Sequence, residues 1–65
     1  MRIVYDPLWN TLRRRGNRPA DLTRICGISS STIRQLQKGE EVSLSTLRKL
    51  CEGLGVRLRD VAEFV

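Results

Sequence analysis

Apolar positions between residues 18 and 39 follow the spacing of two short helices joined by a tight turn. An α-helix has 3.6 residues per turn, so residues three or four positions apart lie on one face. Gly27 stands between the two segments and provides the bend. The segment therefore predicts a helix-turn-helix unit over residues 19–38, packed through Leu22, Cys26, Ile28, Ile33 and Leu36.

The amino-terminal part of the chain predicts one earlier helix. Asp6 followed by Pro7 is a helix start, with Asp6 as the cap and Pro7 at the first helical position. Gly16 ends this helix, and the arginines at 13–15 lie in its last turn, where the helix dipole favours cations. That position explains most of the arginine run. The buried stripe consists of Tyr5, Leu8, Trp9 and Leu12.

The two helices of the central unit have start and stop signals of unequal quality. The first begins near Pro19, where Arg18 is a poor cap that Asp21 partly offsets. The second opens with Ser29 as its cap and ends at Gly39.

The remaining residues predict a longer helix and a short one. Ser43 caps a helix that Gly55 stops, and its apolar positions are Leu44, Leu47, Leu50, Cys51 and Leu54. A short fifth helix closes the core through Leu58, Val61 and Phe64 or Val65. Residues 2–5 are short enough to form only a brief extended arm. We expect an all-α protein, a compact bundle of four to five short helices, with residues 1–65 as a single domain.

The outward face of the second motif helix is entirely polar. Ser31, Arg34, Gln35 and Lys38 fan out on the side opposite Ile33 and Leu36. Such side chains can read base edges and bind phosphates. Any surface helix of a small domain also has a polar face, however, so this pattern alone does not separate DNA recognition from simple solvation.

The distribution of charge separates these two interpretations. The chain has 12 basic and 7 acidic residues, a net charge of +5. Residues 13–38 hold seven basic residues against Asp21 alone, 7 minus 1 or +6, whereas residues 1–12 are neutral and residues 39–65 come to −1. Most of the basic residues are arginine, whose planar guanidinium fits phosphate oxygens and the guanine edge. The excess positive charge coincides with the helix pair, which favours DNA binding.

The chain lacks groups that common enzyme mechanisms need. It has no histidine, so the serines at 29–31 have no usual general base, and helix capping accounts for them better. Gly16, Gly27 and Gly39 are spaced as helix ends and not as a phosphate-binding loop. We expect no enzyme activity.

The two cysteines, Cys26 and Cys51, both fall on apolar stripes. A zinc site needs about four ligands, which two cysteines without histidine cannot supply. A disulfide would require that the helices bring the two thiols together. We expect reduced thiols in the core, no metal and no cofactor.

The central segment resembles the helix-turn-helix of Cro and lambda-type repressors, the Xre family of bacterial and phage transcriptional regulators. The resemblance rests on the five packing residues named above, with Gly27 in the turn and Gly39 at the end of the second helix. It extends over nearly all of the chain. It implies the lambda-repressor-like fold, binding to double-stranded DNA, and a role in transcription regulation, with repression favoured.

Two positions depart from the family pattern. Thr23 stands where the family usually has a small alanine, and we expect its methyl group to pack inward. Pro19 stands where the family often has a DNA-contacting glutamine, so only backbone positioning remains there.

The resemblance implies that the second motif helix enters the major groove while the first crosses the backbone. Base and nearby phosphate contacts are expected from Ser30, Ser31, Arg34, Gln35 and Lys38, and backbone contacts from Arg18 and Arg24.

The family usually binds as a two-fold dimer, so we expect a weak homodimer on inverted-repeat sites. The apolar residues expected to form the dimer contact are Ile3, Phe64 and Val65.

Without an apolar run of ~20 residues or a signal-peptide pattern, we expect a cytoplasmic protein with no membrane partner. The alternative is an antitoxin-like or anti-repressor domain that binds a protein partner.

Overall fold

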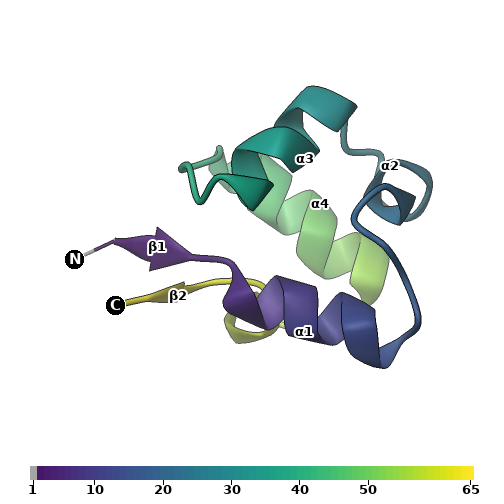
Figure 1. The fold of residues 1–65 in the computed structure, drawn as a ribbon, viewed down its shortest axis with the longest axis horizontal. Coiled ribbons are helices and arrows are strands. Elements are labelled where there is room, and N and C mark those ends of the chain that lie inside the picture. Colours follow the sequence, from purple (N-terminus) through teal and green to yellow (C-terminus); the bar gives the residue numbers. More distant parts are fainter. Residues whose placement is uncertain (1) are drawn as a thin grey trace.

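Short helices make up most of the protein in the computed structural model, which describes residues 2–65 (Figure 1). Within that range there are four α-helices, a 3₁₀ turn and two short strands. In chain order they are β1 (Ile3–Val4), α1 (Asp6–Arg14), α2 (Asp21–Cys26), α3 (Ser30–Gln37), α4 (Leu44–Leu54), η1 (Leu58–Asp60) and β2 (Glu63–Phe64). The all-α prediction is confirmed, with a small two-stranded sheet added.

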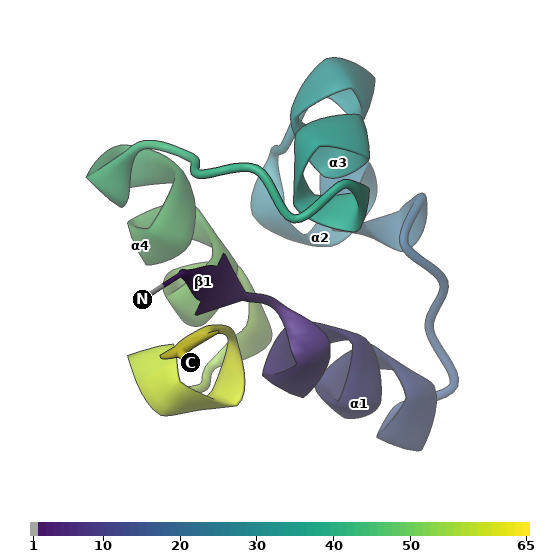
Figure 2. The same cartoon turned by 60° about the vertical axis from the view of Figure 1, so that its left-hand side comes forward.

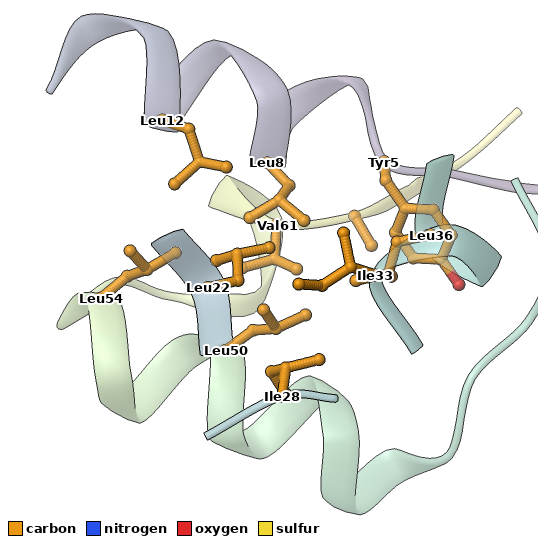
Figure 3. Packing of buried hydrophobic residues seen from close by; sticks show 11 residues of the cluster. Tyr5, Leu8, Leu12, Leu22, Ile28, Ile33, Leu36, Leu50, Leu54 and Val61 are labelled. Carbon is orange, nitrogen blue, oxygen red and sulfur yellow. The ribbon is translucent and has the colours of Figure 1, made fainter. Parts of the chain in front are cut away.

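The core lies where α1, α2 and α4 meet. Figure 3 shows Leu8 and Leu12 of α1 facing Leu50 and Leu54 of α4, with Leu22 of α2 between them. All five side chains are buried, as their apolar spacing predicted. The full buried cluster is Tyr5, Leu8, Leu12, Leu22, Ile28, Ile33, Leu36, Leu50, Leu54, Val61 and Ala62.

Serine residues cap the starts of the two helices for which serine caps were predicted. Ser29 Oγ accepts a hydrogen bond from the backbone N–H of Thr32 at 3.3 Å, and Ser43 Oγ accepts one from Thr46 at 3.2 Å. Each bond satisfies an N–H group that a helix start would leave without a partner.

The predicted starts of the first two helices are wrong by one or two residues. The carbonyl of Tyr5 already accepts the N–H of Trp9, so Tyr5 and not Asp6 is the cap of α1, and Pro7 is the second helical residue. The segment near Pro19 forms a tight turn before α2, because the N–H of Asp21 bonds to the carbonyl of Arg18. α2 itself begins at Asp21.

The predicted short fifth helix is only a three-residue 3₁₀ turn, Leu58–Asp60, and its expected extension to Phe64 or Val65 is wrong. Thr11 of α1 holds this turn by a 3.0 Å hydrogen bond from its hydroxyl to the carbonyl of Asp60. The chain then continues as β2, antiparallel to β1, with Ile3 opposite Phe64 and Val4 opposite Glu63. The extended arm expected at residues 2–5 contains β1, the strand with which β2 pairs.

Leu44 does not join the buried stripe of α4, as the sequence had suggested. It is the first residue of the helix and is 75% exposed. The remaining apolar positions, Leu47, Leu50, Cys51 and Leu54, are buried or half-buried. A residue in the first turn of a helix can project beyond the elements that cover the rest of it.

A close contact between α2 and α4 depends on Gly53. A side-chain carbon at this position would lie 2.6 Å from Cys26 Sγ and 2.9 Å from the Cys26 Cα. Glycine therefore sets how near the two helices approach.

Both Cys26 and Cys51 are free and half-buried, and burial raises the pKa of each thiol. Within residues 2–65, no helix has the length and apolar character needed to cross a membrane.

Candidate nucleic-acid interface

The turn between α2 and α3 is built on Gly27. Its φ of 70° lies in the left-handed region that glycine adopts without strain, and its N–H bonds to the carbonyl of Thr23 at 3.1 Å. Ile28 follows and is 3% exposed, so it fixes the turn to the core. Ser29 then caps α3. The sequence therefore forms the predicted helix, turn and helix in direct succession.

The two faces of α3 differ as the spacing predicted. Ile33 and Leu36 are 6% and 1% exposed and attach the helix to the core. All five residues of the α3 segment predicted to contact DNA, Ser30, Ser31, Arg34, Gln35 and Lys38, are exposed. Within residues 2–65, Arg34 has no carboxylate partner, so its guanidinium is available to a ligand.

Ser30 and Arg34 lie beside the start of α2. They line a shallow hollow of about 270 Å³ with Gln37 of α3 and with Pro19, Ala20 and Thr23 from the neighbouring segment. Thr23 is exposed in this hollow, so the expectation that it packs inward is wrong.

Gln37 was not predicted as a site residue. It lies seven residues after Ser30 and three after Arg34, so helical spacing alone could have placed it on their side of α3.

Ser31 has a structural contact as well as an exposed hydroxyl. Its Oγ lies 3.2 Å from Ser29 Oγ, within the group of hydroxyls that caps α3. A base or phosphate contact by Ser31 would therefore also involve the cap.

Arg18 and Arg24 both associate with Asp21. The Asp21 carboxylate accepts the backbone N–H of Arg18 at 2.8 Å, and lies 3.6 Å from the Arg24 guanidinium. The Arg18 N–H is the main reason that the pKa of Asp21 is lowered, with Arg24 adding to the effect. The Arg24 side chain is 72% exposed, so a phosphate can compete for it. The Arg18 side chain is exposed beside Trp9 and Asn17.

The arginine run at the end of α1 has mainly structural contacts. Arg15 Nη1 donates to the carbonyl of Leu54, the last residue of α4, at 2.6 Å. Arg14 bonds to Thr11 and Arg13 to Asn10 within α1. Residues 18–38 therefore carry four basic residues, Arg18, Arg24, Arg34 and Lys38, against Asp21, which is 4 minus 1 or +3.

Comparison with known proteins gives the same family as the sequence resemblance. The family model of the Cro/C1-type helix-turn-helix DNA-binding domain matches residues 7–65. The crystal structure of the transcriptional regulator VanUg is similar, with a TM-score of 0.89 and 37% sequence identity over 95% of this chain and 83% of that one. No curated protein matched the sequence. The matched family consists of DNA-binding domains and not of enzymes, and the chain belongs to it: this protein is a Cro/C1-type helix-turn-helix protein.

Proposed function

We propose that residues 1–65 act as one domain that binds double-stranded DNA sequence-specifically, with α3 in the major groove and α2 across the backbone. The observation that carries this proposal is the outward face of α3. Its side chains are polar and exposed, and Arg34 has no carboxylate partner within residues 2–65. Such a face can exchange water for base edges without first breaking an ion pair.

Each residue has a role that follows from its chemistry. Arg34 can donate two hydrogen bonds to one guanine, and Gln35 can pair with an adenine or a nearby phosphate. Ser30 and Ser31, at the start of α3, can bond to bases or to phosphates. Lys38, Arg18 and Arg24 neutralise phosphates. Gln37 joins Arg34 as a further base-reading side chain, because both line the same hollow.

The regulatory role that we propose is repression, by a homodimer. An occupied site excludes other proteins from the same stretch of duplex by steric overlap alone, whereas activation needs a further protein contact. A single short helix reads only a few base pairs, so a second copy one helical turn away supplies the remaining specificity. With DNA as its partner and the family resemblance as the guide to its origin, we place the protein in the cytoplasm of a bacterium, encoded by the bacterium or by a phage.

Binding at several salt concentrations tests the proposal. Each neutralised phosphate should contribute about −0.9 to the slope of log K against log salt, so three such contacts give roughly −3 per chain. We expect fluorescence anisotropy with a labelled duplex to show this steep decrease. Absent binding, or affinity that salt leaves unchanged, would contradict the proposal and favour the antitoxin-like alternative, in which the domain binds a protein.

A further inference from the structure

The hollow of about 270 Å³ between α2 and α3 combines polar and apolar side chains. Its polar side chains all belong to α3 and are exposed: Ser30, Arg34 and Gln37. Their nitrogen and oxygen atoms can bond to base edges and phosphates. The other lining residues are mainly apolar: Pro19, Ala20, Thr23 and Ile33. The carbon atoms of these side chains form no hydrogen bond with a base edge, so they suit a ligand group of a different kind.

The apolar part of the hollow belongs to the same surface as Arg34. Ile33 precedes Arg34 on α3 and is 6% exposed, and Pro19 is half-buried. Figures 1 and 2 show α2 and α3 side by side in the upper part of both views, away from β1. When α3 enters the major groove and Arg34 reaches a base, the apolar part of the hollow therefore faces the neighbouring base pairs.

We infer that the apolar part of the hollow binds the C5-methyl group of a pyrimidine, which is thymine in unmodified DNA, in a base pair adjacent to the guanine bound by Arg34. The inference rests on the proposed DNA-binding function. The C5-methyl group is the only apolar group that base pairs present in the major groove. It is therefore the part of a base that side chains such as Pro19, Ala20 and Ile33 can select.

The shape of the hollow favours a group on a larger molecule over a free small ligand. Sites for free small molecules usually bury most of the ligand surface. This hollow is shallow, and two of its lining residues, Ala20 and Thr23, are exposed. Its occupant must therefore be held by further contacts outside the hollow. A methyl group on a duplex that α3 already binds meets this condition.

Thr23 gives the sharpest variants, because its side chain has one methyl and one hydroxyl group. Thr23→Ser removes the methyl group, whereas Thr23→Val keeps the shape and replaces the hydroxyl with a second methyl group. Thr23 is exposed, so neither change opens a cavity in the core. Thr46→Ser is the matched control. It removes the same methyl group from a residue of α4 that does not line the hollow, and it keeps the hydroxyl, which lies 3.0 Å from Ser43 Oγ.

The probe is a duplex obtained by binding-site selection, with each thymine replaced in turn by uracil, which lacks only the methyl group. We expect one thymine, next to the guanine position that Arg34→Ala relaxes, at which uracil weakens wild-type binding about 4-fold, as for one methyl-sized group returned to water. This ratio should fall to about 2-fold or less in Thr23→Ser and rise above the wild-type value in Thr23→Val. Thr46→Ser should keep the wild-type ratio. Thermal unfolding identifies any variant that fails to fold.

A second measurement separates the methyl group from the base pair that carries it. With cytosine at the same position, methylation of its C5 atom should strengthen wild-type binding by about the same 4-fold factor. The base pair and its hydrogen bonds are unchanged in this comparison. If the apolar side chains contacted deoxyribose carbons instead, neither uracil nor 5-methylcytosine would alter the affinity.

The outcomes distinguish this inference from the proposed function. Equal wild-type binding with thymine and uracil at every position overturns the inference and leaves DNA binding intact. A uracil effect of the same size in the wild type and in both Thr23 variants also overturns it, because the methyl group would then be bound outside the hollow. If the wild type binds no duplex, the proposed function and the inference fail together.

Discussion

At the scale of single residues, Arg34 distinguishes base reading from general attraction to DNA. It is the only arginine on α3, is exposed, and has no carboxylate partner within residues 2–65. We expect Arg34→Ala to weaken binding to the selected site by about 1–3 kcal/mol and to relax the preference at one base position. Affinity measurements and binding-site selection on the variant provide the test.

Arg24 is the matched control for this prediction. It is also exposed, but it lies on α2 and already pairs with Asp21. Arg24→Ala should therefore weaken all duplexes to a similar degree and leave the selected sequence unchanged. If the Arg34→Ala variant selected the wild-type sequence, α3 would not be the element that reads bases.

At the scale of elements, Gly53 controls the packing of α4 on α2. Alanine is a better helix former than glycine by about 1 kcal/mol, so propensity alone predicts that Gly53→Ala is stabilising. The added carbon would lie 2.6 Å from Cys26 Sγ and 2.9 Å from the Ile25 carbonyl oxygen, however. We expect this crowding to dominate and the free energy of unfolding in urea to fall by about 1–3 kcal/mol.

Two further variants locate the cause. Glu52→Ala changes the exposed neighbour of Gly53 and should alter stability by less than about 0.5 kcal/mol. Adding Cys26→Ala to Gly53→Ala removes the contact with sulfur but not the contacts with the α2 backbone, so stability should recover only in part. A Gly53→Ala protein more stable than the wild type would mean that α2 can move away at little cost.

Elements with local signals were the predictable ones. The caps Ser29 and Ser43 and the left-handed Gly27 and Gly55 each act within a few residues, and all four lie where the sequence placed them. The prediction for the carboxyl-terminal segment was wrong because the structure of this segment depends on pairing with residues far away in the sequence. Phe64 keeps helical spacing from Leu58 and Val61, yet it pairs with Ile3 from the opposite end of the chain.

The candidate site also has one part that local sequence signals predicted and another part that depends on packing between helices. The outward face of α3 follows from 3.6-residue periodicity, which places Arg34 opposite the buried Ile33 and Leu36 side. The hollow between α2 and α3 and the exposure of Thr23 depend on how two helices pack, which periodicity within either helix does not specify. The contact from Arg15 to Leu54 joins two helices as well, so the sequence, which placed the arginine run in the last turn of α1, could not specify this partner.

At the scale of the whole molecule, Tyr5 connects the amino-terminal part of the chain to the segment that follows α3. Its side chain is 2% exposed, and its hydroxyl donates to the carbonyl of Glu40 at 2.8 Å. Burial raises the pKa of Tyr5 above its ordinary value of 10.0, and the negative charge of Glu41 adds to the rise. The folded protein therefore holds the phenol proton more tightly than the unfolded chain does.

Stability should consequently fall at high pH. The contribution of Tyr5 is complete below the unfolded value of about 10 and is lost as the pH rises through the higher folded pKa, because the unfolded chain releases its proton first. Tyr5→Phe should remove this part of the pH dependence and cost about 1 kcal/mol at neutral pH through the lost hydrogen bond. Tyr5 is the only tyrosine in the chain, so ultraviolet absorbance of the phenolate reports its folded pKa directly. If the free energy of unfolding fell equally above pH 10 in the wild type and in Tyr5→Phe, the phenol proton would not contribute to holding the two parts of the fold together.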